Sequence, residues 1–377
     1  MSKVKLGDVA IEYKETCKGS KDGYPIVGLE HLVPEEVTLT AWDEGSDNTF
    51  TKMFRKGNVL FGRRRAYLKK AAVAPFDGIC SGDITVIEAI PDRILPELLP
   101  FIIQNDELFD FAVGKSAGSL SPRVKWEHLK NYEFELPDMG KQRELAELLW
   151  AMDATKKSYQ KLIAATDELV KSQFIERFGK PGTDPFRWGL TTLGKCCELN
   201  PRKPKGINTD DSYSFVAMPS VSEDGRIDAS VERPYSEVCK GFTYFAENDV
   251  LFAKITPCME NGKGGVAKGL KNGVGFGSTE FHVLRPIKGV SDPYWLYIIT
   301  MFSKFRSDAE KVMTGTGGQR RVPITYLSEY SITLPPIELQ EQFAAFVRQS
   351  DKSKFELEQA LSELTATYKR IITENLG

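Results

Sequence analysis

Basic side chains gather at two matching places in the sequence, and their chemistry suits a polyanion. The stretch from Thr51 to Phe76 holds eight lysines and arginines and no acidic residue. These are Lys52, Arg55, Lys56, Arg63, Arg64, Arg65, Lys69 and Lys70, and a later glycine-rich stretch holds Lys254, Lys263, Lys268 and Lys271. Arginine can donate two hydrogen bonds to a guanine edge, whereas lysines and backbone amides hold phosphates. A solvated surface loop is the alternative, but the recurrence of the pattern favours extended loops that contact DNA.

A second pair of segments combines small hydroxyl residues, glycines and arginines. Residues 116–124 read SAGSLSPRV, and residues 314–322 read TGTGGQRRV. Small residues allow a backbone to approach a phosphate closely, and the arginines would add positive charge. The candidate DNA contacts in these segments are Ser121, Arg123, Gln319, Arg320 and Arg321. A purely structural turn would explain the same pattern and stays open.

Patterns typical of catalysis and of metal binding are missing. The six cysteines form no C-x-x-C pair, and three histidines are few for a zinc site or a histidine-based triad. Residues 114–116 (GKS) lack the first glycine of a phosphate-binding loop, and residues 273–277 (GVGFG) lack the dinucleotide spacing. Asn200-Pro201 lacks the second proline and the aromatic residue of an adenine methyltransferase loop. We therefore expect no catalytic residue, no metal ion and no cofactor bound by this chain.

The sequence contains an internal repeat. Residues 6–7 (LG), 58–61 (NVLF), 81–83 (SGD), 123–124 (RV) and 136–137 (LP) return as 193–194 (LG), 249–252 (DVLF), 278–280 (STE), 321–322 (RV) and 334–335 (LP). The offset only grows along the chain, as insertions in the loops of a second copy would produce. An ordered series of this kind predicts two related domains.

Two long segments have the pattern of coiled-coil helices. Residues 141–178 and 338–376 contain neither proline nor glycine, and apolar residues recur in both at steps of three, four or seven. The predicted stripe consists of Leu145, Leu149, Met152, Tyr159, Ile163 and Val170, and of Phe343, Val347, Leu357, Leu361, Leu364, Tyr368 and Ile371. At ~1.5 Å per residue each helix would be roughly 55 Å long. We expect the two helices to pair antiparallel; packing of each helix on its own domain is the alternative.

Composition and the remaining pattern predict an α+β globular protein. The 377 residues are 27% charged and 41% hydrophobic, and 50 basic against 52 acidic residues leave a net charge of −2, which excludes a histone-like protein that binds by bulk charge. Short apolar and β-branched runs bounded by Gly, Pro or Asp predict strands. We expect a first domain over 1–138, a spacer helix over 139–179, a second domain over 180–337 and a C-terminal spacer helix over 338–377. No segment resembles a membrane span or a signal peptide, which favours a cytoplasmic protein.

These residues together resemble the specificity subunit of type I restriction–modification systems. The resemblance is carried by residues 249–258 (DVLFAKITPC), 260–263 (ENGK), 275–281 (GFGSTEF), 314–323 and the LPP of 334–336 before a helix start. Lys254 and Thr256 lie in this pattern and are candidate DNA contacts. In the first half GRRRAYL, residues 62–68, stands in place of the Lys-Ile-Thr-Pro-Cys type of loop. The two halves are therefore expected to recognise different DNA sequences.

The resemblance implies a division of labour between this chain and its partners. Each globular half would be a target-recognition domain for one half of a bipartite, asymmetric site in double-stranded DNA. The helices would form an antiparallel coiled coil with a pseudo-twofold relation and would dock two modification subunits. S-adenosylmethionine-dependent adenine-N6 methylation would occur in those partners, and ATP- and Mg-dependent cleavage in restriction subunits. A duplicated protein-binding scaffold and a self-contained DNA-modifying enzyme are the alternatives.

Overall fold

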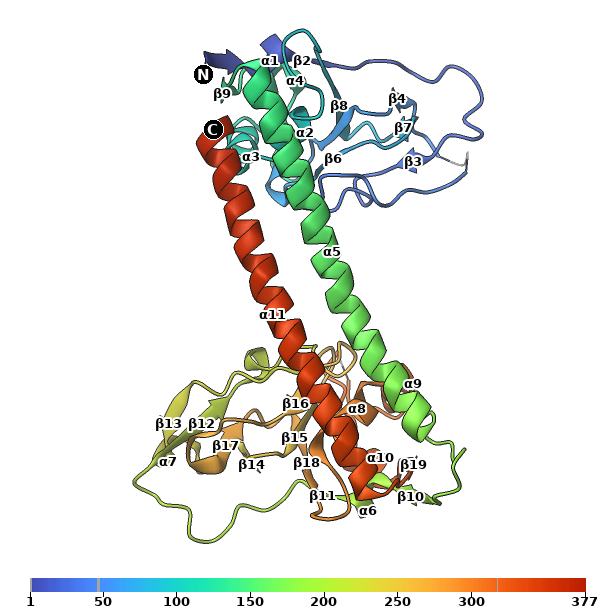
Figure 1. Cartoon of the computed structure of the whole chain (residues 1–377), viewed down its shortest axis with the longest axis vertical. Coiled ribbons are helices and arrows are strands. Elements are labelled where there is room, and N and C mark those ends of the chain that lie inside the picture. Colours follow the sequence, from blue (N-terminus) through green and yellow to red (C-terminus); the bar gives the residue numbers. More distant parts are fainter. Residues whose placement is uncertain (1, 46–47, 317) are drawn as a thin grey trace. The chain divides into compact units, whose positions relative to one another are not determined.

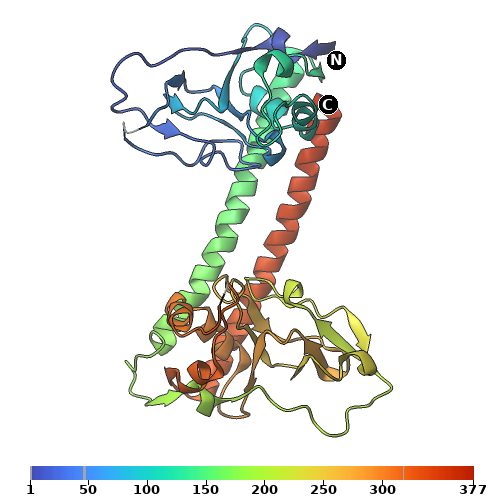
Figure 2. The ribbon, with the colours of Figure 1, turned by 180° about the vertical axis from the view of Figure 1, so that it is seen from behind.

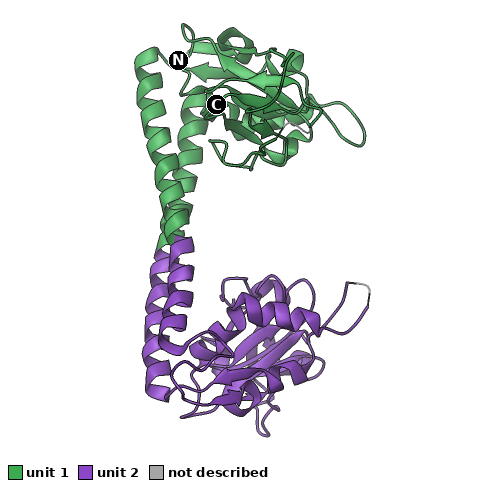
Figure 3. Cartoon of the chain, turned by 90° about the vertical axis from the view of Figure 1, so that its right-hand side faces the viewer, with its two compact units in different colours: residues 1–162, 357–377 green, residues 163–356 purple. Residues whose placement is uncertain are grey.

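A computed structural model of the chain describes residues 2–45, 48–316 and 318–377 (Figure 1). The chain divides into two compact units, residues 1–162 with 357–377 and residues 163–356 (Figure 3). The division falls within two helices of 40 residues each, α5 (Met139–Phe178) and α11 (Ile337–Leu376). Each unit therefore combines one mixed domain, called here the first or second domain, with a part of each long helix.

The first domain is built on three small sheets. Its four-stranded antiparallel sheet has the order β2–β8–β5–β6, its three-stranded sheet has the order β3–β7–β4, and β1 pairs with β9. The strands are β1 (Ser2–Lys5), β2 (Ala10–Glu12), β3 (Ile26–Val27), β4 (Lys52–Phe54), β5 (Val59–Gly62), β6 (Ala71–Val73), β7 (Gly78–Cys80), β8 (Ile84–Ala89) and β9 (Glu133–Leu136). The helices are α1 (Leu6–Val9), α2 (Leu99–Ile103), α3 (Asp106–Gly114), α4 (Trp126–Leu129) and the 3-10 turn η1 (Ala66–Leu68).

The second domain repeats this plan in the same chain order. Its sheets are β11–β18–β15–β16, β13–β12–β17–β14 and β10–β19. The strands are β10 (Leu190–Thr192), β11 (Cys197–Leu199), β12 (Ser212–Val216), β13 (Glu232–Pro234), β14 (Thr243–Ala246), β15 (Val250–Ala253), β16 (Gly264–Val266), β17 (Val274–Gly277), β18 (Phe281–Pro286) and β19 (Ser331–Thr333). The helical elements are α6 (Leu193–Cys196), η2 (Met218–Ser220), α7 (Tyr235–Val238), η3 (Lys271–Gly273), α8 (Pro293–Met301), α9 (Ser303–Lys311) and α10 (Ile324–Glu329).

The strand pairing confirms the predicted duplication. The hairpin β5–β6 corresponds to β15–β16, and β8 corresponds to β18 on the other side of the hairpin. Even the parallel pair recurs, as β3 with β7 and β12 with β17. Only β13 has no counterpart among the described strands of the first domain. Two copies of one α+β fold thus account for both domains.

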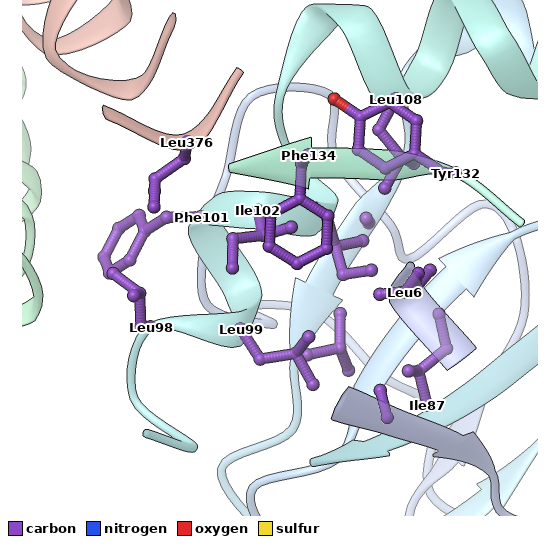
Figure 4. Packing of buried hydrophobic residues seen from close by; sticks show 14 of the residues in the cluster. Leu6, Ile87, Leu98, Leu99, Phe101, Ile102, Leu108, Tyr132, Phe134 and Leu376 are labelled. Atoms are coloured by element: carbon purple, nitrogen blue, oxygen red, sulfur yellow. The ribbon is translucent and has the colours of Figure 1, made fainter. Parts of the chain in front are cut away.

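In the first unit both long helices pack on the core of the first domain. Phe101 of α2 is fully buried and meets the ring of Trp150 on α5 at 5.0 Å and that of Tyr368 on α11 at 6.1 Å. The last turn of α11 places Leu376 beside Phe101, and Leu98 lies on the other side of Phe101 in the same cluster (Figure 4). Strand β1 and the end of α11 both belong to the first unit, which Figure 2 shows from behind.

In the second unit the helices contact each other directly. The ring of Phe343 on α11 lies 5.5 Å from that of Phe174 and 5.4 Å from that of Phe178 on α5. Further along, Lys354 Nζ lies 2.8 Å from Asp167 Oδ1. Because the α5 number falls as the α11 number rises, the helices run in opposite directions here.

The residues of the predicted apolar stripe are all buried or half-buried in the structure. Buried members are Leu145, Leu149, Met152, Val170, Phe343 and Val347, and half-buried members are Tyr159, Ile163, Leu357, Leu361, Leu364, Tyr368 and Ile371. The expected helix ranges, 139–179 and 338–377, compare with 139–178 and 337–376 in the structure. The ends of the helices also pack on the domains. Packing of each helix on a domain, the alternative to helix pairing, therefore accounts for part of the burial. A coiled coil along the whole length stays a prediction.

The glycine-rich stretch 261–277 is not the extended loop that the sequence predicts. It contains β16 and β17, because its glycines allow strands to lie close to other backbone. A Cβ added at Gly265 would lie 2.3 Å from the carbonyl oxygen of Gly225, and one added at Gly277 would lie 2.4 Å from that of Val216. The stretch from Thr51 to Phe76 contains β4, β5, η1 and β6, of which β5 and β6 are among the short apolar runs that were expected to form strands. The true loops are shorter than expected.

Candidate DNA-binding loops

Each domain carries a hairpin loop at the same place in its main sheet. The first hairpin loop, residues 63–70, joins β5 to β6, and the second, residues 254–263, joins β15 to β16. Both follow a strand whose residues are entirely buried. The two segments that were singled out for glycine and arginine, 116–124 and 314–322, lie beside these loops and are called tip segments below. Gly317, in the second of them, lies outside the described residues.

Matching backbone hydrogen bonds attach each hairpin loop to its tip segment. The amide of Val124 donates to the Arg63 carbonyl at 3.0 Å, and that of Val322 donates to the Lys254 carbonyl at 2.9 Å. Two residues into the loops, the amide of Arg65 donates to the Pro122 carbonyl at 2.8 Å. In the same way, that of Thr256 donates to the Arg320 carbonyl at 3.0 Å. The structure therefore brings the two predicted sets of candidate residues together in each domain.

A carboxylate–arginine pair lies at the base of each tip segment. Arg123 donates from Nε to Asp83 Oδ1 at 2.6 Å and from Nη2 to Oδ2 at 3.2 Å. Arg321 donates from Nε to Glu280 Oε2 at 2.9 Å and from Nη2 to Oε1 at 2.8 Å. These hydrogen bonds lower the pKa of Asp83 and of Glu280 below their usual values. The two-pronged geometry fixes the guanidinium plane, so Arg123 and Arg321 hold the loops in place.

Most basic side chains of the first hairpin loop already have a partner. Arg64 donates from Nε to Ser121 Oγ at 2.5 Å and lies 3.4 Å from Asp83. Lys69 pairs with Asp106 at 2.5 Å, and Lys70 donates to the Leu29 carbonyl at 2.7 Å. Arg63 is half-buried, and its Nε has no partner among the described residues.

Arg65 differs from these neighbours. Its side chain is exposed and has no partner in the part of the chain that the structure describes, and its backbone is left-handed with φ of 53°. This conformation costs a non-glycine residue free energy and is held by the loop's other contacts. Arg65 is therefore the arginine of this loop that is most available to an incoming polyanion.

The second hairpin loop offers fewer charges and more neutral donors. Thr256 Oγ1 donates to Glu260 Oε1 at 2.8 Å, and Arg320 lies 3.4 Å from Glu310. Lys263 donates from Nζ to the Met218 carbonyl at 3.4 Å, and Gln319 is exposed. Lys254 is half-buried at the first position of the loop, and its backbone carries the hydrogen bonds described above.

Lys268 is not part of this cluster, contrary to the sequence-based grouping. It follows β16, which runs antiparallel to β15, so it lies beside Asn248 at the opposite end of the hairpin from Lys254. Its ammonium group is 5.8 Å from the centre of the Tyr294 ring. Lys271 is similarly placed elsewhere and lies 3.4 Å from Glu232. Because an antiparallel hairpin reverses the chain, residues that follow β16 lie near the start of β15 and away from the hairpin loop.

His282, which the sequence analysis did not select, supports the second tip segment from below. The side chain is 5% exposed, its Nε2–H donates to the Val322 carbonyl at 2.8 Å, and its Nδ1 lies 3.2 Å from the side-chain nitrogen of Asn200. Burial lowers its pKa to about 4, so the ring is neutral. Its place two residues after Glu280 would not reveal this role from sequence alone.

The described residues contain no group of three or more His, Cys, Asp or Glu side chains arranged to hold a metal ion. Burial raises the pKa of the Cys80 and Cys197 thiols to about 12, which suppresses their nucleophilic thiolate forms. No helix among the described residues is long and apolar enough to span a membrane.

The hairpin loops present hydrogen-bond donors and positive charge at the ends of buried strands, an arrangement suited to binding.

Comparison with known proteins identifies the fold family. The family described as Type I restriction modification DNA specificity domain matches residues 1–165 and 187–365. The chain belongs to this specificity family. Over 201 residues it is 36% identical to the Type I restriction enzyme EcoAI specificity subunit of Escherichia coli, which covers 52% of this chain and 34% of that protein. Over 159 residues it is 40% identical to the EcoEI specificity subunit of Escherichia coli, covering 42% of this chain and 26% of that protein.

The chain thus aligns with about a third or less of the length of these two relatives of the specificity family. A solved structure of the type I restriction–modification system S subunit from M. genitalium is similar over 100% of this chain and 96% of that chain, with a TM-score of 0.59 at 11% identity. At that identity the similarity shows the fold, and it confirms the predicted α+β architecture of a specificity family member.

Proposed function

We propose that the chain is the DNA-recognition subunit of a type I restriction–modification system and reads a bipartite, asymmetric site. The observation that carries this proposal is the repeated loop, attached in each domain to a tip segment by matching hydrogen bonds and a carboxylate–arginine pair. Membership of the specificity family supports the same function. Rigid loops suit recognition because base reading requires donors to be held in a defined position.

The two loops differ in chemistry, which supports recognition of two different sequences. The first presents Arg65, which can donate two hydrogen bonds to a guanine. The second presents the exposed amide side chain of Asn261, a group suited to adenine. An asymmetric site follows from two related domains whose reading loops have diverged.

Methylation and cleavage belong, in this proposal, to partners in the cytoplasm. Two modification subunits would bind S-adenosylmethionine and methylate adenine N6, and restriction subunits would use ATP and Mg²⁺. This chain would bind no cofactor of its own. Large apolar side chains on the outer faces of the helices support docking there, because Leu148, Leu169 and Phe355 are 46%, 49% and 50% exposed.

Methylome sequencing tests the proposal directly. A host that expresses this chain with its cognate modification subunit should acquire adenine methylation in one bipartite motif, and a host that expresses the modification subunit without this chain should not. A confirmed complex that methylates no motif would favour the protein-binding scaffold. Methylation by the purified chain without partners would favour the self-contained enzyme instead.

A further inference from the structure

One buried arginine lies directly beneath the second hairpin loop and has no acidic partner among the described residues. Arg306 of α9 is 8% exposed. No carboxylate lies within ion-pair distance of it among the described residues, unlike Arg285 in the same domain, whose guanidinium binds Asp249. Burial lowers the pKa of Arg306 to about 10, so it remains a cation near pH 7. A buried cation without a countercharge is costly and needs compensating hydrogen bonds.

Those hydrogen bonds go to the loop backbone. Nη1 of Arg306 donates to the Met259 carbonyl, and Nη2 donates to the Gly262 carbonyl at 3.2 Å. The guanidinium also lies over the ring of Phe252, 5.4 Å from its centre, in the strand that leads into the loop. The same side chain therefore contacts both the strand and the loop.

The bound carbonyls end a short helical turn. The amide of Met259 donates to the Ile255 carbonyl at 3.0 Å, and that of Asn261 donates to the Pro257 carbonyl at 3.0 Å. The Met259 carbonyl also accepts from the Gly262 amide at 3.1 Å, so Arg306 is its second donor. Carbonyls at the C-terminal end of such a turn carry partial negative charge, which a nearby cation stabilises. Arg306 fills this role from inside the domain. The exposed residues Pro257 and Asn261 are held by the same turn.

We propose that Arg306 is a positioning residue that sets the sequence specificity of the second domain by fixing residues 255–263. The inference rests on the proposed function and extends it to a residue that need not touch DNA. The first domain has no described counterpart, because its hairpin loop is instead shaped by η1, which packs on α3. Loss of Arg306 should therefore affect one half of the recognition site only.

The test compares Arg306→Met with Arg285→Met in the full chain with its modification subunits. Methionine keeps much of the apolar contact with Phe252 but cannot donate to the carbonyls. Arg285→Met removes another arginine, at the far end of β15 beside Asp249. In Arg306→Met, methylome sequencing should find the bases of one half-site relaxed and the other half-site unchanged. In Arg285→Met, both half-sites should keep their sequence even where activity falls.

Hydrogen exchange gives a readout that does not depend on DNA. In Arg306→Met the amides of residues 259–263 should exchange roughly tenfold faster or more, as expected when charge-assisted hydrogen bonds are lost, whereas those of residues 66–70 should not change. An unchanged motif in Arg306→Met overturns the inference, and so does equal relaxation in both variants. If the wild-type chain directs no motif, the proposed function fails; unchanged exchange at 259–263 would then separately refute the positioning role.

Discussion

At the scale of single residues, arginines of the same candidate site have different tasks. Arg65 is exposed and without a partner among the described residues, whereas Arg123 is bound by Asp83. We expect Arg65→Ala to weaken binding of one half-site by ~1–3 kcal/mol and to relax one base position, with no change in melting temperature. Arg123→Ala should lower the melting temperature and impair the same half-site through a displaced loop. Fluorescence anisotropy with duplexes altered in either half-site, beside thermal unfolding, separates these outcomes.

The repeat indicated these arginines, but their partners could not be read from the sequence. Arg123 and Asp83 are forty residues apart, and only the fold shows that they meet. The same pair in the second copy, Glu280 with Arg321, changes the acid and keeps the geometry. The arginine that recurs in both copies, Arg123 or Arg321, is thus explained by its role in holding the loop. Arg65 has no arginine counterpart in the second copy and is the better candidate for DNA contact.

His282 makes the second unit sensitive to acid. Its pKa is about 4 when folded and near 6.5 when unfolded. Between these values the unfolded chain binds a proton that the folded chain does not, so stability falls as the pH falls below about 6.5. From pH 7.5 to pH 5 we expect a loss of about 2 kcal/mol from this residue. Hydrogen exchange of β18 amides measures it, and His282→Gln should show a smaller loss over the same range.

At the scale of elements, the positions of proline and glycine predicted the long helices well and the loops poorly. Two proline-free segments are flanked by Pro137, Pro335 and Gly179. The helices α5 and α11 begin and end within a residue of the expected positions. The glycine-rich stretch looked like a loop because glycine is a weak strand former. Its strands form because neighbouring backbone leaves no room for a side chain at Gly265 or Gly277, a constraint that arises only in the folded domain.

Two phenylalanines on α11 test which face of the helix supports the fold. Phe343 is fully buried against Phe174 and Phe178, whereas Phe355 is 50% exposed. Phe343→Ala should destabilise the second unit by ~3–5 kcal/mol because it leaves a cavity. Phe355→Ala should change stability by no more than ~0.5 kcal/mol and should weaken assembly with the modification subunit. Denaturant unfolding and analytical ultracentrifugation test both; equal destabilisation would contradict the assignment of faces.

At the scale of the whole molecule, α5 and α11 each contribute to both units. If the proposed function holds, we expect the length of these helices to set the gap between half-sites. One heptad added to both α5 and α11 keeps the apolar stripe almost in phase and adds ~10 Å at ~1.5 Å per residue. That length corresponds to ~3 base pairs at ~3.4 Å each. We expect methylome sequencing of the lengthened chain to find the same two half-sites separated by a longer unread spacer. A heptad inserted into α5 alone, between Asp167 and Phe174, should abolish methylation, because the contacts Lys354–Asp167 and Phe343–Phe174 could then not both form. Altered half-site sequences with an unchanged gap would show that the helices do not determine the spacing.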